Sequence, residues 1–400
     1  MARTRTGRLR RAGGLTAAVT AAVLSAATLP AHAAPEGNIL GADEPGSVGG
    51  SYLVTLGKGI EAPSDAGKSL AAKYGVEIGH TYGSVLNGYA VKANERQARL
   101  LAADPRVASV AQDGRVALDR TQKSPPSWGL DRVDQRNLPL DQRYGWPDSG
   151  GAGVTVYVID TGIRITHRDF GGRASYGWDF VDGDRTAGDG NGHGTHVAGT
   201  IAGTRYGVAK KARVVAVRVL DDAGSGTIAR VIAGIDWVTR HAHRPAVANL
   251  SLGGGHSEQL DAAVRASIAS GVTYTVAAGN EGLPAGRYSP ADVPEAITVG
   301  ATDRTDTRAA FSNFGVALDL FAPGVSITSA SRTSDTGTAT YSGTSMAAPH
   351  AAGAAALYLA EHRRAGPAQV AKALVGHAAT GEVSGAGPGS PDKLLQAPPP

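Results

Sequence analysis

The chain of 400 residues contains no cysteine. This absence excludes a disulfide framework, a catalytic thiolate and a zinc site with cysteine ligands. Stability must therefore come from packing or from bound metal. The hydrophobic fraction of 42% is enough for a packed core and too high for a disordered chain.

Acidic residues and lysine are absent from residues 1–33, which contain five arginines. These arginines account for the basic balance of the whole chain. Without them, the 39 basic residues fall to 34, against 35 acidic residues. The charge balance therefore gives no support for nucleic-acid binding.

After the first 30 residues, no stretch is long and apolar enough to span a membrane. The early arginines precede an apolar run at 15–29, which ends in the small residues Ala31-His32-Ala33. This pattern is typical of a secretory signal peptide cleaved near Ala33. A membrane anchor is disfavoured, because the run is shorter than the roughly 20 residues that span a bilayer. We predict export of the remaining chain, by either the Sec or the twin-arginine route.

The segment after the signal peptide alternates short strand and helix patterns. Strand patterns occur at 51–56, 88–91, 107–110 and 116–118, and helix patterns occur at 65–74 and 94–103. Asn94 suits the N-cap of the second helix. The alternation predicts a small α+β unit, followed by an exposed linker at Pro125-Pro126.

From Trp128 onward, continuous apolar runs alternate with helical stretches. The runs occupy 154–159, 214–220, 246–252, 272–278 and 296–300, and the clearest helices occupy 228–241 and 259–270. Runs without alternation indicate strands buried on both faces. We therefore predict an α/β fold with a doubly wound, mostly parallel sheet flanked by helices. Functional sites in such folds form at the carboxyl ends of the strands.

Three polar residues lie at element boundaries of this predicted sheet. Asp160 ends a strand, while His193 and Ser345 each open a run of small residues with helical character. A serine hydroxyl needs a base to take its proton, and the base needs a group that fixes its tautomer. Ser345, His193 and Asp160 can fill these roles in that order.

Each of these residues has a simpler interpretation when taken alone. Asp160 could be a turn residue, and Ser345 could be a helix N-cap. His193 and His196, three residues apart, could bind metal, although no third ligand follows at the spacing of a zinc protease. The combination in one chain favours nucleophilic catalysis.

The segments around these residues resemble the subtilisin-like serine proteases, specifically the proteinase K-like branch that includes aqualysin. The resemblance covers nearly all of residues 128–395 and five segments in family order: 157–163, 190–200, 251–255, 277–280 and 343–350. The order Asp, His, Ser is the subtilisin arrangement. Residues 343–347 do not form the G-x-S-x-G elbow, which argues against an α/β-hydrolase esterase.

The resemblance implies a role for each of four residues. Ser345 attacks the scissile carbonyl, His193 accepts its proton and delivers it to the leaving amine, and Asp160 orients the imidazole. The side-chain amide of Asn280 and the backbone N–H of Ser345 stabilise the oxyanion. From its neighbours alone, Asn280 could instead be a turn residue before Glu281-Gly282.

The resemblance also implies how substrate binds. An extended peptide adds as a strand between two segments, Gly224-Ser225-Gly226 and Ser251-Leu252-Gly253. A roomy pocket for the residue before the cut is floored by Ala277, Ala278 and Gly279. We expect broad endopeptidase activity with an apolar or aromatic preference at that residue.

Calcium is the cofactor that the resemblance implies, as a structural ion in one or two sites. Hard oxygen ligands suit this ion. The first site would use backbone carbonyls of Pro294 and Ala296 with the carboxylate of Asp319. The second would use Asp131, Asp134, Gln135 and Asp141. Ordinary surface turns and helix caps are the alternative explanation of both sets.

Residues 34–120 resemble the inhibitor-type propeptide of this family, which has a ferredoxin-like fold. The resemblance implies a folding template that inhibits the enzyme within its own chain and is cut off near 120–121. We thus expect a signal peptide at 1–33, a propeptide at 34–120, and a catalytic domain at 121–400 with a short flexible tail.

The sequence predicts a secreted serine endopeptidase made as a zymogen. It would act as a monomer on polypeptides, with no nucleic-acid partner and no membrane association after signal cleavage. The alternative is a non-catalytic peptide-binding protein on a protease scaffold, but such a protein would normally lack one of the four residues above. An exported esterase is also less favoured, because Asn280 and the two clamp segments suit amides in extended chains.

Overall fold

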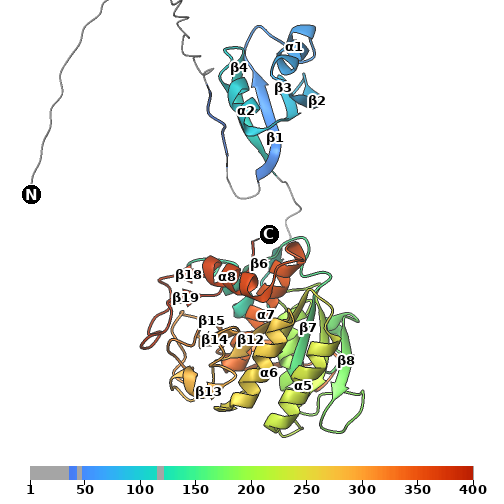
Figure 1. The fold of residues 1–400 in the computed structure, drawn as a ribbon, viewed down its shortest axis with the longest axis vertical. Helices are drawn as coiled ribbons and strands as arrows, with labels where there is room; N and C mark the ends of the chain where they lie inside the picture. Colours follow the sequence, from blue (N-terminus) through green and yellow to red (C-terminus); the bar gives the residue numbers. More distant parts are fainter. Residues whose placement is uncertain (1–35, 43–46, 115–120, 400) are drawn as a thin grey trace, which may run out of the picture. The chain divides into compact units, whose positions relative to one another are not determined.

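The computed structural model describes residues 36–42, 47–114 and 121–399. The chain divides into two compact units, Met1–Val116 and Ala117–Pro400 (Figure 1). The predicted signal peptide, the strand expected at 116–118, and Arg120 at the predicted cut lie outside the described residues. No helix in the described part is long and apolar enough to cross a membrane.

The first unit is a four-stranded antiparallel sheet with two helices (Figure 1). Its elements in chain order are β1 (Ser47–Leu56), α1 (Asp65–Lys73), β2 (Glu77–Tyr82), β3 (Gly88–Lys92), α2 (Glu95–Ala102) and β4 (Val107–Gly114). The sheet order β2-β3-β1-β4, with a helix after the first and third strands, is the predicted ferredoxin-like arrangement.

Local sequence signals explain the boundaries of α2. The Asn94 side chain accepts a hydrogen bond from the Gln97 backbone N–H, and the Gln97 side chain accepts one from the Asn94 N–H. This reciprocal pair satisfies two donors that the first helical turn leaves free. Strand β2 was missed from the sequence, because its residues are exposed or half-buried and carry no apolar alternation.

The second unit contains a nine-stranded sheet in the order β18-β19-β15-β14-β12-β10-β7-β9-β8. All neighbouring strands are parallel except β18 and β19. The mostly parallel sheet predicted from the apolar runs is confirmed. The strands are β7 (Thr155–Asp160), β8 (Ala174–Asp179), β9 (Arg213–Arg218), β10 (Ala246–Leu250), β12 (Thr273–Ala277), β14 (Ile297–Thr302), β15 (Leu320–Pro323), β18 (Ala379–Thr380) and β19 (Lys393–Leu394).

Helices cover both faces of this sheet (Figure 1). They are α3 (Trp128–Val133), α4 (His193–Ala202), α5 (Ile228–His241), α6 (Glu258–Ala269), α7 (Thr344–Glu361) and α8 (Pro367–His377), with 3₁₀ turns at Arg168–Phe170 and Ala285–Arg287. Three strand pairs lie outside the sheet: β5 (Thr121–Lys123) with β6 (Arg143–Gly145), β11 (Gly254–Gly255) with β13 (Tyr288–Ser289), and β16 (Ile327–Ala330) with β17 (Thr338–Tyr341).

The continuous apolar runs are explained by two separate cores. Along β7, Val156 and Val158 point into the core shared with α4 and α7. Tyr157 and Ile159 point to the opposite face and pack with α5 and α6. Successive residues of a strand face opposite sides, so a strand covered on both sides must be apolar throughout.

The C-terminal segment differs from the flexible tail that we expected. Lys393–Leu394 forms β19, which pairs with β15 in the main sheet. Leu394 and Leu395 are fully buried, and the Leu395 N–H donates to the Phe321 carbonyl at 2.8 Å. The Gly- and Pro-rich composition of 384–392 concealed these apolar anchors. Strand β8 was also not predicted, because it is half-buried at the edge of the sheet and its residues are not apolar throughout.

Candidate active site

The strand end at Asp160 holds the side chain of His193. The Asp160 carboxylate is fully buried, and its two oxygens lie 2.8 and 3.0 Å from His193 Nδ1. The same carboxylate accepts a hydrogen bond from the Thr161 N–H at 2.7 Å. A carboxylate on Nδ1 keeps the proton on that nitrogen and leaves Nε2 free as an acceptor.

Two glycines allow α4 to approach the end of β7 closely. A Cβ atom on Gly194 would lie 2.1 Å from the Gly162 carbonyl oxygen, so no other residue fits there. Gly162 itself has φ of 104°, a conformation that side chains rarely tolerate. The sequence therefore uses backbone contact to bring His193, the first residue of α4, to Asp160.

Asp189 stabilises the loop that leads into α4. Its carboxylate accepts hydrogen bonds from the backbone N–H groups of Asn191, Gly192 and Thr195 at 3.0, 2.7 and 2.8 Å. It also accepts from the hydroxyls of Thr161, at 2.9 Å, and Thr195. Asp189 thus ties the loop of His193 to the residue after Asp160. We did not single it out from the sequence, although it lies four residues before His193.

The pKa of His193 is raised above its ordinary value. Burial acts to lower the pKa, but the charge and hydrogen bond of Asp160 outweigh it, and Asp189 adds to the rise. The side chain nevertheless remains 26% exposed, so it is accessible from the cavity described below.

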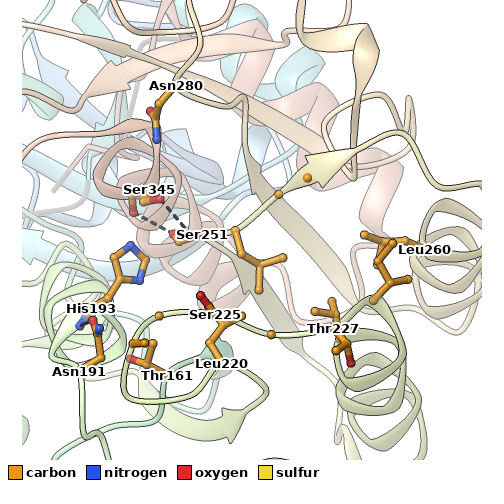
Figure 2. Close-up of a pocket in the computed structure, with 18 of the residues that line it drawn as sticks. Thr161, Asn191, His193, Leu220, Ser225, Thr227, Ser251, Leu260, Asn280 and Ser345 are labelled. Atoms are coloured by element: carbon orange, nitrogen blue, oxygen red, sulfur yellow. Dashed lines mark hydrogen bonds between the residues drawn. The ribbon is translucent and has the colours of Figure 1, made fainter.

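Ser345 lies in the first turn of α7, beside Ser251. Its hydroxyl donates to the Ser251 carbonyl at 3.0 Å, and the Ser251 hydroxyl donates to the Ser345 carbonyl at 2.8 Å (Figure 2). The hydrogen bonds found among the described residues do not include one between Ser345 and His193. The two side chains line the same cavity, and a change of the Ser345 χ1 rotamer redirects its hydroxyl.

The side chain of Asn280 is oriented by Thr344. Its Oδ1 accepts hydrogen bonds from the Thr344 N–H at 2.8 Å and from the Thr344 hydroxyl at 2.9 Å. The amide nitrogen is consequently directed away from Thr344 and toward Ser345 (Figure 2). Asn280 is therefore held in one orientation even though it is exposed.

A cavity of about 650 Å³ brings together the two predicted clamp segments and three of the four predicted catalytic residues. Ten further lining residues were not among the predicted site residues. The predicted residues that line it are His193, Asn280, Ser345, Gly224, Ser225, Gly226, Ser251, Leu252 and Gly253. The additional lining residues include Thr161, Asn191, Leu220, Thr227 and Leu260 (Figure 2).

A second cavity adjoins the first at Ser345. It is lined by the predicted pocket residues Ala277, Ala278 and Gly279, together with Glu281 and Tyr288, which the motifs did not indicate. Its volume of about 80 Å³ is smaller than the roomy pocket that we expected. A side chain that enters the smaller cavity can also extend into the larger one, because the two cavities adjoin. They share five lining residues: Leu252, Gly253, Gly254, Asn280 and Ser345.

His196 is a core residue rather than a metal ligand beside His193. Its Nε2 lies 2.9 Å from the Ile327 carbonyl, and its ring stacks on Tyr341. Burial lowers the pKa of His196 to about 4, which keeps the ring neutral. The alternative of a metal site at His193 and His196 is not supported by this environment.

The first predicted calcium set lies where β14 and β15 begin. Asp319 directly precedes β15, its Oδ2 accepts from the Thr298 N–H at 2.8 Å, and burial raises the pKa of this carboxyl to about 6. Ala296 directly precedes the neighbouring strand β14, and Pro294 lies two residues before Ala296. The carboxylate has no ion-pair partner among the described residues, so its chemistry fits a cation.

The second predicted calcium set contains three carboxylates around 131–141. Asp134 Oδ1 is buried and accepts no hydrogen bond within the described chain. Burial, together with the charges of Asp141 and Asp131, raises the pKa of Asp134 to about 7. Gln135 Oε1 accepts from the Asp141 N–H at 3.1 Å. An unpartnered carboxylate oxygen among other acids fits an oxygen-liganded cation such as Ca²⁺.

Two family models match this chain. The subtilase family matches residues 151–393, and peptidase inhibitor I9 matches residues 51–119. The first match contains Asp160, His193 and Ser345, and the second covers the four-stranded sheet unit from Ser51 onward.

Proteins with similar sequences carry the names of serine proteases. An extracellular serine proteinase of Thermus sp. (strain Rt41A) is 48% identical over 96% of this chain and 99% of its own length. An alkaline serine exoprotease A of Vibrio alginolyticus is also 48% identical, over 82% of this chain and 61% of its own length. The crystal structure of a cold-adapted subtilisin-like serine proteinase has 53% identity and a TM-score of 0.66, covering 68% of this chain and 98% of the other.

These matches agree with the fold, with the hydrogen bond between Asp160 and His193, and with the position of His193 and Ser345 on one cavity. The chain belongs to the subtilase family and is a serine protease whose catalytic unit follows a peptidase inhibitor I9 domain.

Proposed function

We propose that this protein is a secreted serine endopeptidase made as a zymogen, with Ser345, His193, Asp160 and Asn280 as its catalytic residues. The supporting observation is that His193, whose Nδ1 is held by the buried carboxylate of Asp160, lines the same cavity as Ser345. The rival reading, a non-catalytic peptide-binding protein, would not need a buried carboxylate to fix the tautomer of a histidine beside a serine.

The reaction begins when the Ser345 hydroxyl turns from the Ser251 carbonyl toward His193. His193 Nε2 takes the proton as the oxygen attacks the peptide carbonyl, and the imidazolium returns it to the leaving amine. The buried charge of Asp160 stabilises that imidazolium. Water then attacks the acyl-enzyme, with His193 again taking the proton, and Ser345 is released.

Asn280 stabilises the oxyanion together with the backbone N–H of Ser345. Because the N–H and hydroxyl of Thr344 both donate to Asn280 Oδ1, the side-chain amide N–H of Asn280 already points toward the site where the oxyanion forms. Such a donor is worth about 2.7–4 kcal/mol of transition-state stabilisation; this magnitude was established for the corresponding asparagine of subtilisin.

Substrate binds as an extended strand between the clamp segments 224–226 and 251–253. Backbone hydrogen bonds supply affinity with little dependence on sequence. The small residues Ala277, Ala278 and Gly279 favour an apolar or aromatic side chain before the cut.

Digestion of denatured casein with and without a serine-directed phosphonofluoridate tests the proposal. We expect many cuts, mostly after apolar and aromatic residues, and complete inhibition with one label per chain on Ser345. Binding of casein without cleavage would favour the peptide-binding alternative, and strict cleavage after basic residues would contradict the proposed pocket.

The rate should depend on pH through His193. The base must be neutral to accept a proton, and Asp160 raises its pKa. We therefore expect kcat/KM to rise with pH, reach half its plateau above about pH 6.5, the ordinary histidine value, and remain high in mild alkali. Initial rates on a neutral peptide substrate measure this profile. A flat profile from about pH 5 to 9 would exclude His193 as the base.

The zymogen arrangement follows from the I9 domain. We propose that residues 1–33 are a signal peptide, that 34–120 assist folding and inhibit the enzyme until cut near 120–121, and that 121–400 act as a secreted monomer. The extracellular Thermus relative, aligned along nearly its whole length, supports export.

We also propose that calcium stabilises the catalytic unit at the two sets described above. Asp131, Asp134, Gln135 and Asp141 would hold one ion, and Asp319 with the carbonyls of Pro294 and Ala296 would hold the other. Bound calcium would neutralise carboxylates that the fold otherwise leaves unpaired, and it takes no part in the reaction.

Chelation should lower the melting temperature. An ion present at 100 times its Kd adds about 2.7 kcal/mol, or roughly 5–10 °C in a unit of this size. Differential scanning calorimetry of the inhibited protein with calcium and with EDTA measures the change. Asp134→Asn and Asp319→Asn should each reduce the response, while the exposed control Asp236→Asn should retain it. An unchanged melting temperature in EDTA would contradict both sites.

A further inference from the structure

Three side chains outside the sites described above form a compact group of metal-binding atoms. One ligand atom from each of His256, Asp261 and Asp292 lies within 4.8 Å of the other two. His256 follows β11, Asp261 lies in the first turn of α6, and Asp292 follows β13. The group therefore joins three elements of the fold.

Asp261 is a buried carboxylate without a hydrogen-bond partner. Its side chain is 1% exposed, and neither of its oxygens has a partner in hydrogen-bond geometry within the described residues, although Ser289 and Asp292 lie beside it. The nearest cationic group is His256 Nδ1, which lies 3.5 Å from Asp261 Oδ2 but only 2.9 Å from Asp292 Oδ2. One imidazole thus faces two carboxylates. One imidazole cannot balance the charges of two carboxylates, and a buried carboxylate charge that is not balanced is costly, so the group suits a cation.

The ligand types favour a transition metal over calcium. Calcium takes oxygen ligands, whereas an imidazole nitrogen with two carboxylate oxygens suits zinc. With zinc bonds of about 2.0–2.2 Å, tetrahedral ligands lie roughly 3.4 Å apart. The distances of 2.9 and 3.5 Å from His256 Nδ1 are close to this value. The His256 side chain is 54% exposed, which leaves room for entry and for water as a fourth ligand.

We propose that His256, Asp261 and Asp292 bind a divalent transition-metal ion, for which zinc is the matching probe, and that the ion braces the pocket beside Ser345. Strand β11 pairs with β13, and Gly254, Tyr288 and Ser289 from this pair line the smaller cavity. An ion held by residues that follow both strands would link the two walls of that cavity. The proposal uses none of the catalytic residues and does not depend on the proposed reaction.

Isothermal titration of the full protein with zinc, in excess calcium and with a serine-directed inhibitor present, tests this site. The variants His256→Gln and Asp292→Asn remove exposed or half-buried ligands, so they should fold. His243→Gln, at another exposed histidine, is the matched control. Thermal unfolding of the same four proteins with and without zinc gives a second readout.

We expect the wild type and His243→Gln to bind zinc and to melt at a higher temperature with it. His256→Gln and Asp292→Asn should bind zinc more than about 10-fold more weakly, since even loss of an outer partner of a metal ligand costs that much. They should also lose the thermal shift. The proposal would be overturned if the wild type did not bind zinc, or if His256→Gln and Asp292→Asn bound zinc as tightly as the wild type.

Discussion

Replacement of Ser345 by alanine should abolish proteolysis and leave the propeptide attached. The alanine has no nucleophile for His193 to activate, so neither substrate nor the chain's own junction near 120–121 can be acylated. Loss of this group in subtilisin lowers kcat by on the order of 10⁶-fold, and we take the magnitude from that enzyme. Intact mass and casein hydrolysis of the purified variant measure both effects.

A control separates lost chemistry from lost folding. Ser270→Ala changes a serine at the end of α6 that lines neither cavity and should mature normally. A trace of wild-type protein added to Ser345→Ala should cut its propeptide in trans if the variant is folded. Normal self-maturation of Ser345→Ala in a purified system would contradict the proposed nucleophile.

The strands of the main sheet could be predicted where burial on both faces makes them apolar throughout. Val156 to Ile159 are an example, because each residue packs in one of two cores. Strand β2 and the edge strand β8 could not be predicted this way, because most of their residues are exposed or half-buried and apolar and polar residues are mixed along them.

The sequence predicted the reactive residues of the candidate site but not the residues that support them. Motifs gave the residues that bear reactive groups, such as His193 and Ser345. They did not indicate supporting contacts such as those of Asp189, whose hydrogen bonds go mainly to backbone N–H groups that any sequence possesses. The group of His256, Asp261 and Asp292 was missed because Asp292 lies far along the chain from the other two and is brought to them by the pairing of β11 with β13.

Asp160→Asn should lower kcat by about 10⁴-fold, the loss seen for the equivalent change in a serine protease of another fold. The asparagine amide presents N–H groups where His193 Nδ1 needs an acceptor. The imidazole then favours the tautomer with its proton on Nε2, which cannot accept the proton of Ser345. Steady-state kinetics on a peptide substrate should show this loss in kcat with a nearly unchanged KM, because Asp160 is buried and does not line the cavity.

The pH profile of this variant distinguishes a role in positioning from a structural one. The negative charge of Asp160 raises the pKa of His193, so its removal should move the acid limb of kcat/KM to lower pH. Asp236→Asn, at an exposed acid paired with Arg240, should leave both the rate and the profile unchanged. If Asp160→Asn retained activity within about 10-fold of the wild type, tautomer control would not be the function of this carboxylate. If its rate fell without movement of the acid limb, the loss would come from disturbed packing, because a change of charge 2.8 Å from Nδ1 must alter the affinity of His193 for protons.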